Sequence, residues 1–332
     1  MPLEHVPIID IAPYRTGSET SKWGVAEQIG EACRDIGFLV IAGHGVSQTL
    51  IDAVDDVSRI FFDLPLAEKM RVVRPATDVT RGYIPMEGES VGRSRGEYAP
   101  GDLNESMMIG PVDVGDDVYY HSSAAGKHFA ANLWPERPAA LREIYTAYSR
   151  VMSDLACTMM RLFALALDQP ETFFDDKIDK HISRLRVRNY PAPQVPPQPG
   201  QLRAGAHSDY GSLTILKTED KPGGLQVYNK AGTWVDVPIV PHCFVVNPGD
   251  LMARWTNDHW VSTLHRVVNP PMEVAAISRR QSLVFFHNPN YDAVIECIPS
   301  CQSPDYLPKY PVATSGEHLR TQFVRTQTEA GR

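Results

Sequence analysis

Hydrophobic and polar positions follow a helical period in the first half of the chain and a strand-like period in the second. Apolar residues recur three and four positions apart in three stretches, which predict helices over residues 22–35, 47–62 and 139–167. Two short runs rich in β-branched residues, 6–11 and 37–41, predict strands beside the first of these helices. We therefore expect the first half to be mainly helical, with few strands.

After residue 181 the apolar runs shorten, and turns containing glycine, proline or asparagine separate them. These runs predict short strands over residues 185–190, 212–216, 225–228, 234–237, 244–247, 250–255, 263–268 and 281–286. Many short strands joined by such turns are typical of β-sandwiches and jelly rolls. We expect a mainly β fold with helical flanks, built around a double-stranded β-helix (jelly-roll) core.

No low-complexity linker divides the chain, so we expect one integrated catalytic unit. Its predicted parts are an N-terminal helical and strand region (1–110), a helical support (111–180), the jelly-roll core (181–290) and a C-terminal extension (291–332). Residues 316–323, within the extension, are expected either to form a helix over the mouth of the barrel or to pack on a second subunit. The sequence leaves the oligomeric state open.

Composition and charge exclude several classes of protein. The 332 residues are 43% hydrophobic and 22% charged with a net charge of −8, an ordinary globular mixture whose acidic balance argues against nucleic-acid binding. There is no apolar run long enough to cross a bilayer and no signal-peptide pattern, so we expect a cytoplasmic protein without a membrane partner. The five cysteines suggest no disulfide framework, and we interpret Cys297 and Cys301, four positions apart, as reduced thiols.

The sharpest chemical motif is a histidine and an aspartate two positions apart. In an extended strand His207 and Asp209 point to the same side, so both can face one metal ion. A second histidine with open coordination positions would complete a facial triad of the kind that selects non-haem Fe(II). The downstream candidates are His242, His259, His265 and His287. We favour His265, because it alone is centred in a strand-like run.

A second motif could hold a carboxylate. Arg280 and Ser282 are two positions apart in a predicted strand, so a guanidinium and a hydroxyl can meet one anion.

Together these motifs resemble the non-haem Fe(II)/2-oxoglutarate-dependent dioxygenases of the isopenicillin N synthase-like type. The resemblance covers about residues 6 to 315 and rests on the segments 207–209, 265–270, 280–282 and 285–286, with 6–10, 33–38 and 43–46 in the first half. It implies that His207, Asp209 and His265 bind iron. It also implies that Arg280, Ser282 and Tyr190 hold the distal carboxylate of 2-oxoglutarate.

One position departs from the family pattern. Where many relatives have an asparagine two residues before the tyrosine, this chain has Arg188. An arginine on the pocket face could meet an anionic substrate instead of the cosubstrate.

The implied activity is oxidation of an unactivated C–H bond of a small molecule, with 2-oxoglutarate and O₂ consumed and succinate and CO₂ formed. Hydroxylation is the outcome we expect first, and desaturation, epoxidation or cyclisation would use the same ligands. Ascorbate is expected as the reductant in vitro. Two alternatives stay open: an iron oxidase of the same fold that uses no 2-oxoglutarate and binds its substrate carboxylate at Arg280 and Ser282, and a ligand-binding barrel or zinc hydrolase.

Substrate contacts are expected from the loop-rich region 80–110 and its neighbours, because loops vary most on a fixed scaffold. The candidates are Tyr83, Asn104, Arg188 and Tyr210.

Overall fold

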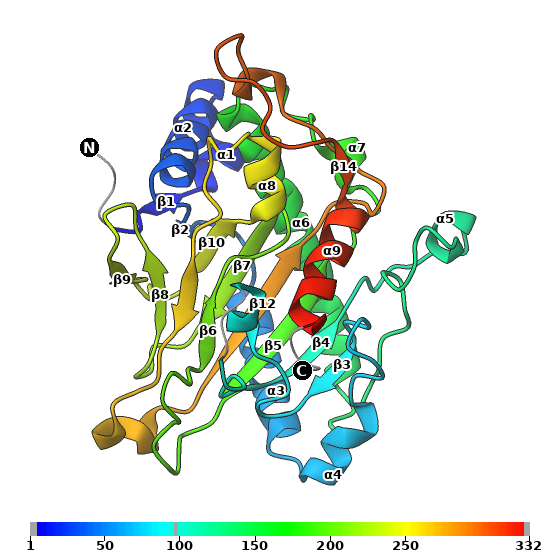
Figure 1. The fold of residues 1–332 in the computed structure, drawn as a ribbon, viewed down its shortest axis with the longest axis vertical. Helices are drawn as coiled ribbons and strands as arrows, with labels where there is room; N and C mark the ends of the chain where they lie inside the picture. Colours follow the sequence, from blue (N-terminus) through cyan, green and yellow to red (C-terminus); the bar gives the residue numbers. More distant parts are fainter. Residues whose placement is uncertain (1–4, 96–98, 329–332) are drawn as a thin grey trace.

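Two β-sheets packed face to face form the centre of the molecule in a computed structural model, which describes residues 5–95 and 99–328 (Figure 1). The large sheet has eight strands in the order β1 (Ile8–Asp10), β2 (Leu39–Ala42), β10 (Phe244–Pro248), β7 (Leu213–Thr218), β12 (Arg280–His287), β5 (Arg184–Tyr190), β4 (Glu105–Ile109) and β3 (Gly82–Ile84). The small sheet has four, in the order β6 (Ala204–His207), β11 (His265–Val267), β8 (Leu225–Tyr228) and β9 (Trp234–Asp236). A two-stranded sheet pairs β13 (Val294–Ile295) with β14 (Ala313–Thr314).

Alternation along the central strands separates a helix-packed face from an inner face. On β5, Leu185 and Val187 join the main hydrophobic cluster beneath the helices. The residues between them turn toward the small sheet, because successive strand side chains point to opposite faces. On β12 the same alternation sends Leu283 and Phe285 to the helices and Arg280 and Ser282 to the inner face. The inner face of these two strands therefore carries the arginines of β5 with Arg280 and Ser282, beside apolar side chains of β12.

Three long helices cover the outer face of the large sheet. They are α2 (Glu19–Asp35), α3 (Gln48–Phe62) and α6 (Leu141–Ala166), and each lies within a few residues of its predicted span. Along α6 the buried residues Met152, Leu155, Met159 and Leu162 recur at three- and four-residue spacing. Each such side chain contributes on the order of 2 kcal/mol by leaving water.

The remaining helices are short, apart from the C-terminal one. They are α1 (Ala12–Thr16), α4 (Leu66–Lys69), α5 (Val118–His121), α7 (Asp175–Ile178), α8 (Asp250–Trp255) and α9 (Ser315–Thr328), with 3₁₀ turns η1 (Met70–Val72), η2 (Val91–Arg95), η3 (Met272–Ile277) and η4 (Pro299–Cys301). Residues 316–323 belong to helix α9, which lies beside η2. Packing of this segment on a second subunit stays a prediction. No helix in the described residues is both long and apolar enough to span a bilayer.

The strand prediction for residues 250–255 is wrong, since these residues form helix α8. A short apolar run cannot be assigned by period alone, and Leu251 and Trp255 also fall on one side of a helix. The first turn of α8 is fixed by tertiary contacts. The backbone N–H groups of Asp250 and Leu251 donate to the carbonyls of Asp209 (2.7 Å) and Gly211 (3.1 Å). The helix start is therefore tied to the loop that follows β6.

Strands from the predicted N-terminal region and from the predicted core lie in one sheet. Strand β2 pairs with β10, and β4 pairs with β5. This agrees with an integrated unit, while the four segment boundaries stay predictions.

A buried ion pair joins α4 to β4. The Nζ of Lys69 lies 2.7 Å from Oε2 of Glu105, and both side chains are less than one-tenth exposed (9% and 6%). The same carboxylate accepts hydrogen bonds from the hydroxyl of Tyr83 (2.5 Å) and from Nδ2 of Asn189 (2.8 Å). This network closes the side of the large sheet that faces α3.

We predict that Glu105→Gln lowers the free energy of unfolding by about 3 kcal/mol, because it leaves the Lys69 ammonium buried without a counter-charge. Urea denaturation followed by circular dichroism measures the change. The matched control is Glu136→Gln, whose partner Arg71 is 3.5 Å away in a pair exposed at 68% and 87%. That change should cost less than about 0.5 kcal/mol. Equal losses in the two variants would contradict the prediction.

Candidate metal centre and adjoining cavity

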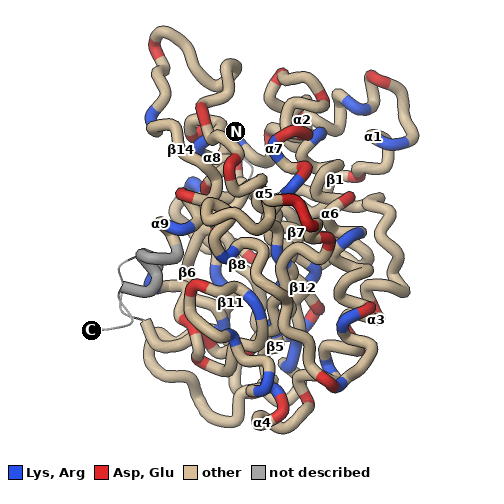
Figure 2. The backbone as a smooth tube through the Cα atoms, turned by 90° about the vertical axis from the view of Figure 1, so that its right-hand side faces the viewer, with Lys and Arg blue, Asp and Glu red and all other residues tan. Residues whose placement is uncertain are grey.

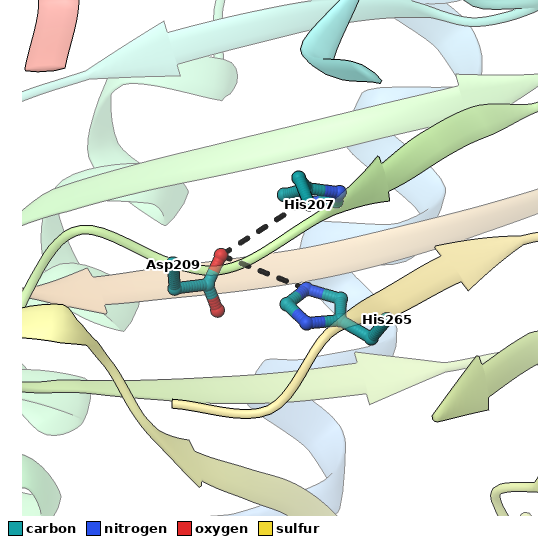
Figure 3. Close-up of side chains that lie close together, drawn as sticks. All are labelled: His207, Asp209 and His265. Atoms are coloured by element: carbon teal, nitrogen blue, oxygen red, sulfur yellow. Dashed lines mark ion pairs between the residues drawn. The ribbon is translucent and has the colours of Figure 1, made fainter. Parts of the chain in front are cut away.

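Two histidines and an aspartate converge between the sheets (Figure 3). His207 ends β6 and His265 begins β11, and the two residues are direct partners in the antiparallel pairing. Their ring centroids are 4.3 Å apart. Oδ1 of Asp209 lies 3.9 Å from Nε2 of His207 and 3.7 Å from Nε2 of His265. Among the described residues this is the only group of three such side chains close enough to share an ion.

Hydrogen bonds fix the orientation of both rings. Nδ1 of His207 lies 2.8 Å from the Gly205 carbonyl, and Nδ1 of His265 lies 3.0 Å from the Thr263 carbonyl. A carbonyl oxygen can only accept, so each Nδ1 carries the proton and each Nε2 keeps its lone pair. These lone pairs face Asp209, and carbonyl-bound histidines of this kind are the usual form of metal ligands.

The large sheet holds the Asp209 carboxylate. Its Oδ2 accepts hydrogen bonds from Thr214 on β7 (2.7 Å) and from Asn247 on β10 (2.8 Å), so Oδ1 is left for the two rings. Burial works against the charge, but the two histidines and these two donors outweigh it and lower the pKa of Asp209. Burial, with the neighbouring His265, lowers the pKa of His207 to about 3. An ionised carboxylate and a neutral imidazole are the protonation states that metal binding requires.

The other candidate histidines lie elsewhere. The ring of His287 is buried 2.8 Å from the Ser212 hydroxyl, and His259 stacks on Tyr306 with ring centroids 5.0 Å apart. His242 makes a hydrogen bond with Gln48 (2.9 Å).

A buried arginine lies on the inner face of β12. Arg280 is 1% exposed, and its guanidinium carbon stands 4.8 Å from the ring centroid of Tyr190. The guanidinium donates to the hydroxyl of Thr218 and, at 3.4 Å, to the Gly223 carbonyl. Its Nε is buried with no partner among the described residues. Ser282 is buried on the same face. Arg280 and Ser282 together can therefore bind an anion.

A cavity of about 620 Å³ opens beside the triad. Its lining includes His207 and Asp209 together with five arginines: Arg74, Arg93, Arg184, Arg186 and Arg188. Figure 2 shows basic positions inside the molecule around β5 as well as at its surface. Glu89 partly neutralises them, with one oxygen 2.6 Å from Arg74 and the other 2.7 Å from Arg186.

Known proteins are similar to this chain over nearly its whole length. Residues 6–137 match the sequence profile of the family described as non-haem dioxygenase in morphine synthesis N-terminal, and residues 182–289 match the 2OG-Fe(II) oxygenase superfamily. The 2-oxoglutarate-Fe(II) type oxidoreductase hxnY of Emericella nidulans is 32% identical, over 98% of this chain and 91% of its own length. A homoarginine-6-hydroxylase of Oryza sativa is 31% identical, over 95% of each chain.

A solved structure of a full-length Neurospora crassa protein in complex with alpha-KG and thymine is 30% identical, with a TM-score of 0.84 and 97% of each chain covered. The chain belongs to the 2OG-Fe(II) oxygenase superfamily. The jelly-roll fold expected from the strand pattern is thereby confirmed, and so is the 2-oxoglutarate-dependent dioxygenase activity on a small molecule. The family relationship supports neither an oxidase without 2-oxoglutarate nor a zinc hydrolase.

Of the four residues that the sequence suggested as substrate contacts of this oxygenase, two line the cavity and two do not. Arg188 and Tyr210 line the cavity. Asn104 lies behind Arg188, with Oδ1 3.3 Å from its Nη1. Tyr83 does not line the cavity, because it lies on the helix-facing side of the large sheet, where it packs edge-on against Phe61.

The sequence reasoning missed several cavity residues of the oxygenase: Arg74, Glu89, Arg184, Arg186 and Leu319. The period-two run of arginines at 184, 186 and 188 was a signal for three same-facing charges. Glu89 and Leu319 carried no such signal, since only the fold brings the loop before η2 and helix α9 to this cavity.

The Glu89 carboxylate gives the oxygenase a measurable pH dependence. Burial raises the pKa of Glu89, but Arg186 and Arg74 outweigh burial and lower it from 4.5 to about 2. Such a group adds stability above its unfolded pKa, and that stability is lost as the pH falls toward the folded pKa. The contribution at neutral pH is about 3 kcal/mol.

We therefore predict that Glu89→Gln destabilises the oxygenase at pH 6 and above, and that the difference from the unchanged protein shrinks as the pH falls from 5 to 3. Urea titrations at a series of pH values measure this difference. A constant difference across the series would show that Glu89 is not ionised between its two arginines.

Proposed function

We propose that His207, Asp209 and His265 bind Fe(II), and that Arg280, Ser282 and Tyr190 hold the distal carboxylate of 2-oxoglutarate. The proposal rests chiefly on one observation: two Nε2 atoms and one carboxylate oxygen face a common point, with every other polar atom of these three side chains already bonded. A set of two imidazoles and one carboxylate with open positions suits non-haem Fe(II).

The Arg280 group fits the distal end of the cosubstrate. A carboxylate there would give the buried Nε of Arg280 its missing acceptor and would add a charge-assisted hydrogen bond. Burial lowers the pKa of Arg280, which reflects the cost of a buried cation and favours a bound anion. Tyr190 beneath the guanidinium limits its movement.

Bound at these residues, Fe(II) and 2-oxoglutarate would supply the oxidising chemistry: one oxygen atom of O₂ would convert the keto acid to succinate and CO₂, and the other would be used to oxidise the substrate. The protein then positions a C–H bond over the metal and excludes water. His207 and His265 hold their protons on Nδ1 throughout, and the Thr214 and Asn247 hydrogen bonds keep Asp209 from rotating. Positioning is thus the main contribution of this chain, with no acid–base group required.

We further propose hydroxylation as the outcome, a proposal supported by the similarity to the homoarginine-6-hydroxylase. Ascorbate would keep the metal ferrous in vitro. A cytoplasmic location agrees with five free cysteines.

For the metal ligands, we predict that His207→Ala abolishes both tight Fe(II) binding and succinate formation. Removing one of three ligands leaves too few donors to hold the ion. Anaerobic titration with Fe(II) measures binding, and succinate is measured with Fe(II), ascorbate, O₂ and 2-oxoglutarate. His259→Ala, which removes an exposed residue's ring stacked on Tyr306, is the control and should bind Fe(II) normally. Normal Fe(II) binding by His207→Ala would refute the ligand assignment.

For the cosubstrate, we predict that Arg280→Gln weakens 2-oxoglutarate binding at least about thirtyfold, the loss expected when a buried charge pair loses one partner. Calorimetry on the anaerobic Fe(II) protein measures this affinity. Its neighbour Arg279 is the matched control, because it faces the other way and pairs with Asp63 at 2.7 Å. Arg279→Gln should change the affinity by less than about twofold. Equal effects of the two changes would argue against the site.

A further inference from the structure

We propose that the substrate is a small carboxylic acid with an apolar body, and that Arg188 binds its carboxylate. The inference deepens the proposed function and rests on it, since the substrate must lie beside the same triad. Arg188 lies on the inner face of β5, is 6% exposed, and lines the cavity together with His207 and Asp209.

Arg188 makes few polar contacts with the rest of the described protein. Among the described residues its one hydrogen bond is a long contact, 3.3 Å from Nη1 to Oδ1 of Asn104, and it makes no ion pair. A guanidinium carries five N–H donors, so most of its hydrogen-bonding capacity is available to a ligand. By contrast Arg186, two positions earlier on the same face, bonds to both Glu89 and Ser106.

The carboxylates near Arg188 are bonded to other groups. The oxygens of Glu89 bind Arg74 and Arg186. Asp102 accepts backbone N–H groups of Val91 (3.1 Å) and Gly205 (3.0 Å), one on each oxygen. Both carboxylates attract Arg188 only across a longer distance. A buried cation without a contacting counter-charge is costly, and an anionic ligand would remove that cost.

The placement favours the substrate over the cosubstrate. Arg188 pairs with Ser282 in the register of β5 and β12, so it stands at the border of the proposed 2-oxoglutarate site. The cavity lining includes Arg188 but none of Arg280, Ser282 and Tyr190. An anion in this cavity can therefore reach Arg188, whereas Arg280 lies outside the cavity lining.

The rest of the cavity suits an apolar body. Met108 on β4, Phe286 on β12 and Leu319 on α9 contribute hydrocarbon surface to its wall. Its volume of about 620 Å³ lies within the roughly 300–1,000 Å³ typical of sites for drug-sized ligands. A carboxylate held at Arg188 would place the attached hydrocarbon between this wall and the triad.

The test compares acids with their neutral amides on the full chain, loaded with Fe(II) and saturating 2-oxoglutarate under anaerobic conditions. The probes are phenylacetate against phenylacetamide and 3-phenylpropanoate against 3-phenylpropanamide, with affinities measured by calorimetry. We expect each acid to bind at least about tenfold more tightly than its amide, which corresponds to about 1.4 kcal/mol. Arg188→Gln should bring the two affinities within about twofold, and Arg188→Lys, which keeps the charge, should give an intermediate ratio.

Two further measurements keep the result interpretable. Arg71→Gln, which removes a positive charge from a side chain exposed at 68%, should leave the acid preference intact. The affinity for 2-oxoglutarate is measured in every variant and should stay within about threefold in Arg188→Gln, because Arg280 carries that interaction. Circular dichroism checks that each variant is folded. If Arg188→Gln is unfolded, the ratio of acid to amide affinity in Arg188→Lys is the test instead.

Three results would overturn the inference: no acid binds better than its amide, the acid preference survives in Arg188→Gln, or Arg188→Gln loses 2-oxoglutarate as strongly as Arg280→Gln. The last result would assign Arg188 to the cosubstrate site. A failure of the proposed function itself is distinguishable, because the unchanged protein would then bind no 2-oxoglutarate and form no succinate.

Discussion

The antiparallel pairing of β6 with β11 is the constraint on which the site depends. It sets His207 directly opposite His265, so two imidazoles from distant parts of the chain face one point. A slip of one residue in this register would turn one ring to the other face of the small sheet. Asp209 lies just beyond β6, and its position depends on the other sheet: α8 fixes its carbonyl, and β7 and β10 fix its carboxylate. The site therefore forms only when both sheets are stacked.

Buried positive charge is the second feature of the inner face. Arg184, Arg186, Arg188 and Arg280 all lie on the β5 and β12 surface that faces the small sheet, and all are buried. Burial of so many guanidinium groups works against folding unless each finds hydrogen bonds or a counter-charge. Glu89 forms an ion pair with Arg186, whereas Arg280 and Arg188 each retain N–H groups that can donate to a ligand. A fold that tolerates such a surface is suited to anionic ligands at two separate points.

Segments that are distant in the sequence complete the cavity beside the three candidate metal ligands. Strands β3 and β4 extend the large sheet, the loop before η2 brings Glu89 against β5, and α9 adds Leu319. The metal ligands come from the sheets, while much of the cavity wall comes from loops and the C-terminal helix. A scaffold of this kind can change substrate through its loops without disturbing the ligands.

The sequence by itself determined the long helices, most strands and the motif residues. The reason is local: an amphipathic period over many residues identifies α2, α3 and α6, and a two-residue spacing places Arg280 with Ser282 on a common face of β12. Asp209 lies beyond the end of β6, so strand alternation does not set its position beside His207. The short apolar run at α8 was ambiguous in period and was decided by contacts with the loop after β6. Tyr83 lies on the helix-facing side of β3, and nothing local in the sequence tells which face of β3 meets the cavity. The placement of His265 opposite His207, the pairing of Glu89 with two arginines and the free donors of Arg188 depend on strand register and on packing between distant segments, which only the tertiary structure decided.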